Sequence, residues 1–310
     1  MATSRTIRHN LLAVFACLLW SSAFVTVKHA LDHQTPLNLA GMRFVLAGLI
    51  QIPLCGNLLA PFRMIRDEFA TVLLVGFFHT IFLYGTFFIG LSWVRGAEGA
   101  IMIGVGPLAS ALMAHVMMHD DKMQRRTLLS IVIGMAGVVF ISLASKPWNP
   151  VGFKEFIGLM LLLSGAVVSA VGNIVVAKHR GGLHPVALNS AQMLVGGIVL
   201  LLIAFPFEGA PVLRAPTAFY GQLLWLATIS ATAFAIWFHL LSKIKVSKLN
   251  LWKFIIPLSG AALSWLLLPG ESPTLPSLIG MALIITGIVV GQSEGRKAAA
   301  YLRARFTRVK

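Results

Sequence analysis

Residues 248–271 read KLNLWKFIIPLSGAALSWLLLPGE, an apolar run that holds Lys253 and, four residues later, Pro257. A lysine seeks water, and a proline inside a helix removes a backbone hydrogen bond and crowds the previous turn. Residues 98–121 read EGAIMIGVGPLASALMAHVMMHDD, with Pro107 in the place of Pro257. The pattern therefore occurs twice, 150 positions apart.

The composition of the chain indicates a membrane protein. Of its 310 residues, 57% are hydrophobic and 11% are charged, whereas about a quarter are charged in soluble domains. The net charge of +15 does not predict nucleic-acid binding, because the basic residues form short clusters between apolar runs. Cys17 and Cys55 lie in apolar runs without metal-ligand or redox spacing, so we expect small buried fillers and no cofactor.

The apolar runs predict an all-α polytopic membrane protein with ten transmembrane helices. A helix needs roughly 20 residues to cross a hydrocarbon core of about 30 Å. Runs of that length occur at residues 10–31, 36–56, 67–92, 96–118, 126–145, 153–177, 185–206, 217–241, 248–268 and 276–292.

The positive charges between these spans predict the orientation of the chain. Cytoplasmic connections of membrane proteins retain Lys and Arg. With the N-terminus in the cytoplasm, 18 of the 25 basic residues are cytoplasmic and 5 are outside, namely Lys28, Arg95, Lys146, Lys154 and Arg214. Both termini are therefore predicted to be cytoplasmic, and the basic C-terminal tail is expected to lie against anionic headgroups.

A repeat divides the chain into residues 1–150 and 151–310. The offset of 150 aligns Lys28-His29 with Lys178-His179, Pro107 with Pro257 and Gly137 with Gly287. Each half has five predicted spans, and because five is odd the second half must enter the membrane from the opposite side. Inverted repeats are typical of secondary transporters, because two oppositely oriented halves give inward-open and outward-open states of similar energy.

Pro107 and Pro257 lie near the middle of the fourth span of each half, among small residues. Proline frees a backbone carbonyl, which is tolerated at that depth only where protein or a water-filled cavity meets it. One interpretation is a packing kink. The other is that both helices line a central path, with the two prolines as hinge or gating residues.

Several motifs, taken together and in order, resemble the EamA type of the drug/metabolite transporter superfamily. They are LLWSSAF around Trp20, Pro36 followed by GMRF with Arg43, the two prolines, and Gly270-Glu271. The first half has His119-Asp120-Asp121 where the family pattern has Gly-Glu. The chain most resembles the bacterial aromatic amino-acid exporters, which implies a multi-pass protein of the inner membrane that binds a small-molecule substrate.

Polar residues at mid-membrane depth are the candidates for substrate binding, since lipid cannot satisfy them. They are Trp20, Ser21, Ser22, His79, Tyr84, Ser164, Ser169, Asn173, Gln192, Thr228, Ser230 and Thr232, with the cations Arg43 and Lys253 and, at the outer mouth, Glu98. We select Trp20, Arg43, His79, Tyr84 and Lys253 as substrate-binding residues. Snorkelling of the two cations and ordinary helix packing of the others are the alternatives.

The preferred function is export of small metabolites, namely amino acids including aromatic ones, by alternating access. No carboxylate lies at the centre of a predicted span, so coupling to protons would need histidine, or efflux is facilitated. A channel-like protein, a nucleotide-sugar or drug-type carrier and an intramembrane enzyme are the alternatives. The chain has no HExxH pair and no P-loop, so neither an enzyme nor an ATP-driven pump is expected, and we expect a monomer.

Overall fold

Helices make up all the regular structure in the part of the chain that the structure describes, which confirms the all-α prediction there. The computed structural model describes residues 2–93, 104–144, 152–178, 183–267 and 273–292. Glu98, Glu271 and the basic C-terminal tail lie outside these residues. The elements are α1 (Ala2–Ala30), α2 (Pro36–Gln51), η1 (Ile52–Cys55), α3 (Ala60–Asp67), α4 (Phe69–Gly76), η2 (Phe77–Ile81), α5 (Phe82–Trp93), α7 (Gly106–Met117), α8 (Arg125–Ala144), α9 (Phe153–Lys178), α10 (Pro185–Glu208), α11 (Thr217–Leu241), α12 (Val246–Asn250), η3 (Leu251–Phe254), α13 (Ile255–Leu267) and α14 (Leu275–Gln292).

Six described segments are long and apolar enough to cross a membrane. They are Pro36–Cys55, Phe69–Trp93, Phe156–Lys178, Pro185–Glu208, Thr217–Leu241 and Leu275–Gln292. Large apolar side chains also point outward, such as Val116 and Leu202, each 68% exposed. A surface of this kind is suited to lipid and not to water. The total of ten spans stays a prediction.

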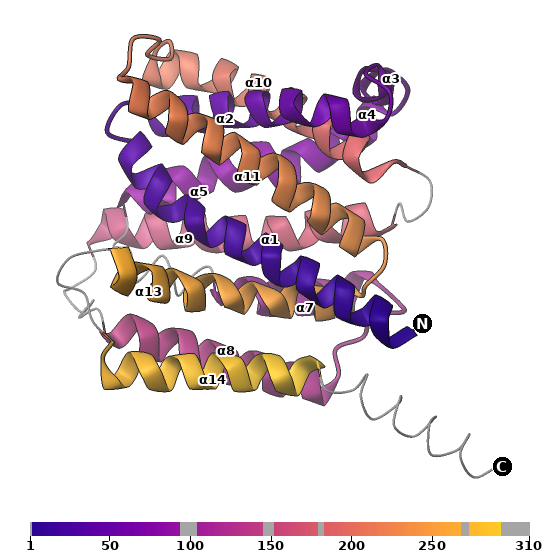
Figure 1. Cartoon of the computed structure of the whole chain (residues 1–310), viewed down its shortest axis with the longest axis vertical. Coiled ribbons are helices and arrows are strands. Elements are labelled where there is room, and N and C mark those ends of the chain that lie inside the picture. Colours follow the sequence, from indigo (N-terminus) through magenta and orange to yellow (C-terminus); the bar gives the residue numbers. More distant parts are fainter. Residues whose placement is uncertain (1, 94–103, 145–151, 179–182, 268–272, 293–310) are drawn as a thin grey trace.

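Each long helix of the first half packs against a helix of the second half (Figure 1). The pair α2 and α10 forms one edge of the molecule, and the pair α8 and α14 forms the other. Between these edges, α1 packs on α11 and α13, while α9 packs on α5 and α7. The centre of the molecule is therefore built from both halves of the sequence.

The edge pair α8 and α14 is packed closely enough for backbone to meet backbone. A Cβ atom added at Gly137 would lie 2.5 Å from the carbonyl oxygen of Gly280, a separation that real Cβ atoms do not adopt. Small residues allow this approach between helices in membranes, where lipid supplies no hydrophobic force between helices. This contact joins α14 to α8, which lies near the end of the first half.

Two of the predicted spans contain an irregular turn between two α-helices in their described parts. The third predicted span contains the π-helical turn η2 between α4 and α5, and the ninth contains the 3₁₀ segment η3 between α12 and α13. Irregular turns inside helices are frequent at functional sites. In this chain they carry His79 and Lys253, respectively.

Candidate functional site

A cavity of about 170 Å³ lies between the central helices. Its walls come from α1, α2, η2, α5 and α7 of the first half and from α9, α11, η3 and α13 of the second half. An engineered cavity of about 150 Å³ accepts benzene, so this one has room for a small ring. The lining residues with aromatic or polar side chains are Trp20, Arg43, His79, Tyr84, Phe87, Ser110, Ser169, Asn173, Phe234, Trp237 and Lys253.

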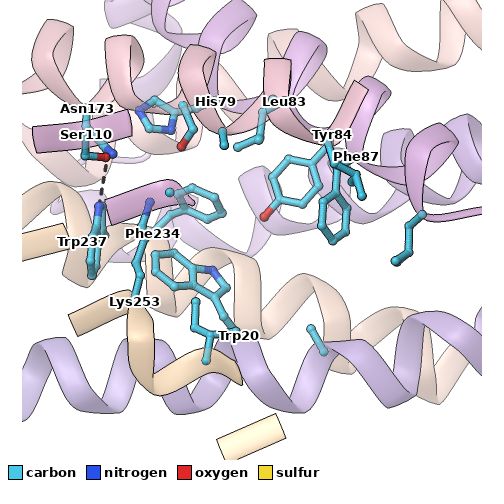
Figure 2. Close-up of a pocket in the computed structure, with 18 of the residues that line it drawn as sticks. Trp20, His79, Leu83, Tyr84, Phe87, Ser110, Asn173, Phe234, Trp237 and Lys253 are labelled. Carbon is cyan, nitrogen blue, oxygen red and sulfur yellow. Dashed lines mark hydrogen bonds between the residues drawn. The ribbon is translucent and has the colours of Figure 1, made fainter. Parts of the chain in front are cut away.

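All five residues selected from the sequence for substrate binding line this cavity. Figure 2 shows Trp20 and Lys253 on one side of it, with His79 and Tyr84 opposite. The five residues come from five separate elements, α1, α2, η2, α5 and η3, and from both halves of the chain. The structure thus brings together the predicted residues, while their role in binding stays a proposal.

The π-helical turn η2 explains how His79 and Tyr84 share a wall although they are five residues apart. Phe82 donates its backbone N–H to the carbonyl of Phe77, five residues back, as in a π-helix. This wider turn rotates later residues relative to a regular α-helix. Nε2 of His79 lies beside the backbone of Gly172, but neither ring nitrogen has a partner at hydrogen-bond geometry among the described residues.

Lys253 is held in place by an aromatic face. Its Nζ atom lies 5.1 Å from the ring centroid of Trp237, in a cation–π arrangement. Trp237 in turn donates its indole N–H to Oδ1 of Asn173 at 3.2 Å, the bond drawn in Figure 2. The Nδ2 atom of Asn173 donates to Oδ1 of Asn250 at 3.3 Å. These two hydrogen bonds connect α9, α11 and α12 next to the lysine.

Arg43 does not snorkel to a membrane surface, because it is 2% exposed within the helix bundle. Its Nε donates to Oγ of Ser230 at 2.7 Å, and its guanidinium carbon lies 5.4 Å from the rings of both Phe44 and Tyr84. Within the described residues, the only ion pair is between Arg66 and Asp67 on the surface. Neither cavity cation therefore has a carboxylate partner in that part of the chain.

The two prolines lie in the first turns of α7 and α13, each shortly after an irregular point in its predicted span, at the turn residue Val105 and in η3 respectively. Pro107 is the second residue of α7, and Pro257 is the third residue of α13, directly after η3. Proline is favoured in a first helical turn, because its missing N–H would have no intrahelical partner there. Both side chains are buried next to cavity residues, Ser110 and Ile256 respectively.

Several other polar candidates serve helix packing instead of the cavity. Ser22, Ser164 and Thr228 donate to backbone carbonyls of their own helices. Gln192 belongs to a buried amide chain, in which Thr80 donates to Gln192 at 2.6 Å and Gln192 donates to Asn189 at 3.0 Å. Gln192 does not line the cavity. These residues match the packing alternative.

Sequence reasoning missed three aromatic residues of the cavity, Phe87, Phe234 and Trp237, and the structural role of one acid. Phe234 and Trp237 of α11 line the cavity, and their spacing of three residues on an apolar helix is the available signal. The acid is Asp121, which stands where the family pattern has Gly-Glu, and it is 2% exposed. It accepts the backbone N–H of Ser247 at 2.9 Å and the Ser247 hydroxyl at 2.5 Å, so it caps the start of α12.

Comparison with known proteins agrees with this arrangement. The model of the EamA-like transporter family matches residues 8–143 and 156–290. The uncharacterized transporter YvbV of Bacillus subtilis is 25% identical over 296 residues, covering 94% of this chain and 95% of that protein. A protein of Salmonella typhimurium described as a probable amino-acid metabolite efflux pump is 26% identical over 298 residues, covering 91% of this chain and 94% of that protein.

A solved crystal structure has the same fold, with a TM-score of 0.79 and 18% sequence identity. The alignment covers 94% of this chain and 98% of the solved chain. The family match extends over most of the sequence and confirms the family predicted from the motifs. The chain therefore belongs to the EamA-like transporter family and is a multi-pass membrane transporter, not an enzyme.

Proposed function

We propose that the chain exports small metabolites, amino acids including aromatic ones, from the cytoplasm across the bacterial inner membrane. The observation that carries this proposal is the central cavity, which is lined by aromatic rings and by two cations, one from each half of the chain, that have no carboxylate partner among the described residues. Aromatic rings suit a flat apolar group, and Arg or Lys suits a carboxylate. The description of the Salmonella relative as a probable amino-acid metabolite efflux pump supports the same substrate class.

We further propose that residues 1–150 and 151–310 act as two inverted halves of five spans each. The family model matches one stretch in each half. The first helix of each half packs on two helices of the other half: α1 packs on α11 and α13, and α9 packs on α5 and α7. In this scheme both termini are cytoplasmic, and the protein works as a monomer. Rocking of one half against the other would expose the cavity to each side in turn, with Pro107 and Pro257 at helix starts beside it.

Substrate counterflow in proteoliposomes tests the transport proposal. Vesicles loaded with unlabelled phenylalanine should accumulate labelled phenylalanine, and the rate should saturate with concentration. A rate that rises linearly without saturation indicates a channel and contradicts alternating access. Labelling of single cysteines introduced near each end of the chain, in a background that lacks Cys17 and Cys55, tests whether both termini are cytoplasmic.

A further inference from the structure

The unpaired polar groups around the cavity are mostly hydrogen-bond donors. Nζ of Lys253 and the terminal amino groups of Arg43 have no hydrogen-bond acceptor among the described residues. The buried indole N–H of Trp20 also has no partner there. One of the two unpaired ring nitrogens of a neutral His79 is a donor as well. The cavity therefore offers more donors than its own acceptors use.

The charges around the cavity have the same sign. Its ionisable lining residues in the described part of the chain are Arg43, His79, Tyr84 and Lys253, and none of them is an Asp or Glu. Removing a charge from water is unfavourable unless a partner of opposite charge compensates it. Two cavity cations without a carboxylate partner among the described residues thus leave a place for an added anion.

A carboxylate and an ammonium group meet this lining in opposite ways. An ionised carboxylate accepts about four hydrogen bonds and donates none, whereas an ammonium donates three and accepts none. The carboxylate therefore complements both the donors and the charges of the cavity, and the ammonium is repelled by Arg43 and Lys253.

Aromatic faces also compensate cations, but two of those at this site already do so for the protein's own residues. Lys253 lies over the ring of Trp237, and Arg43 lies over the ring of Tyr84, at 5.1 and 5.4 Å respectively. The ring of Trp20 packs edge-on against Phe234 and Trp237, with centroids 5.2 and 5.1 Å apart. An ammonium on the substrate would compete for these surfaces.

From this excess of hydrogen-bond donors and positive charges we propose that the cavity selects its substrate as an anion. A small aromatic monocarboxylate without an amino group binds more tightly than the zwitterionic amino acid with the same ring, and the matching amine binds least. This inference rests on the proposed transport function and narrows its substrate class to aryl-substituted carboxylic acids.

Three ligands with one phenyl group and one two-carbon linker test the proposal. They are 3-phenylpropanoate, which is an anion, phenylalanine, which is a zwitterion, and phenethylamine, which is a cation. Isothermal titration calorimetry on the purified full-length protein at pH 7 measures each dissociation constant without interference from passive membrane permeation. We expect 3-phenylpropanoate to bind at least tenfold more tightly than phenylalanine, and phenethylamine more weakly than both.

The outcomes separate this inference from the proposed function. If phenylalanine binds as tightly as 3-phenylpropanoate or more tightly, the anion selection is wrong and amino-acid export stands. If phenethylamine binds best, the inference is wrong and a cation carrier is indicated. If neither carboxylate binds, both the inference and the proposed function fail.

A charge variant locates the preference in the cavity. Lys253→Met should reduce the advantage of 3-phenylpropanoate over phenylalanine at least threefold, because it removes one of the two cations. Lys243→Met is the matched control, since Lys243 is exposed and does not line the cavity. An unchanged ligand preference in a folded Lys253→Met protein would rule out Lys253 as the anion partner, and the comparison of ligands on the unmodified protein remains decisive if the variant does not fold.

Discussion

The ring centroid of Trp237 lies 5.1 Å from Nζ of Lys253. The tryptophan belongs to α11 and the lysine to the 3₁₀ segment η3, so this contact joins two separate elements of the second half. The bond from the Trp237 indole to Asn173 fixes the orientation of the ring. The position of the ammonium group inside the cavity is therefore set by its surroundings before any substrate arrives, which reduces the ordering needed on binding.

Substitution of the two predicted binding residues should reduce transport without unfolding the protein. We expect Lys253→Met and His79→Leu each to lower amino-acid transport at least tenfold, a loss of about 1.4 kcal/mol. The lysine supplies a charge for the substrate carboxylate, and the histidine supplies a ring nitrogen that has no hydrogen-bond partner among the described residues. Counterflow in proteoliposomes measures the rate.

Matched controls separate this effect from general damage to the protein. Lys243→Met and His119→Leu remove the same side-chain types at exposed positions outside the cavity and should transport normally. Size-exclusion chromatography in detergent checks folding. Normal transport by both cavity variants would assign Lys253 and His79 to packing. Trp20 and Arg43 would then be the main candidates for substrate binding.

The two prolines should affect transport more than stability. Pro107→Ala and Pro257→Ala fall in first helical turns, where the new backbone N–H needs no intrahelical partner, so the folded state should tolerate both. We expect a slower counterflow rate with little change in melting temperature. Pro206→Ala, inside α10 and away from the cavity, is the control. Loss of stability in step with loss of transport would favour a packing role.

Asp121 should stabilise the fold through Ser247. Asp121→Ala removes the acceptor of a buried backbone N–H and of a hydroxyl, which costs about 1–3 kcal/mol when the donor stays unpaired. We expect a lower melting temperature in detergent, measured by intrinsic fluorescence. The neighbouring exposed residue provides the control, because Asp120→Ala leaves the Ser247 contacts in place. Equal melting temperatures for the two variants would contradict the capping role.

Two glycine substitutions should affect stability differently, because only Gly137 lies at the close contact between α8 and α14. Gly137→Ala would place Cβ 2.5 Å from the backbone oxygen of Gly280, and forced overpacking costs about 1–3 kcal/mol. Gly221 in α11 has no atom within 4 Å of an added Cβ, so Gly221→Ala should gain helix propensity. We expect the first variant to melt earlier and the second to melt at the same temperature or later. The reverse order would contradict the observed helix contact.

Sequence reasoning located the central helices and the cavity residues for separate reasons. Apolar runs predict helices because membrane thickness imposes their length, and Arg43 and Lys253 stand out because lipid cannot solvate them. The π-helical turn at His79 leaves no trace in an apolar run, since any apolar side chain is compatible with it. Asn173 and Ser230 are among the polar candidates of the sequence, but their pairing with Trp237 and Arg43 depends on which helices meet in space, so a linear pattern does not predict it.

The pairing of α8 with α14 also bears on how the protein is made. The end of α8 at Ala144 is synthesised long before α14 begins at Leu275, and each of these helices finds its main partner in the other. During biosynthesis the face of α8 that carries Gly134 and Gly137 therefore has no α14 to pack against until nearly the whole chain has been inserted. We expect α8 and α14 to associate last, so that crosslinking between cysteines placed on them appears only in chains that extend beyond residue 292.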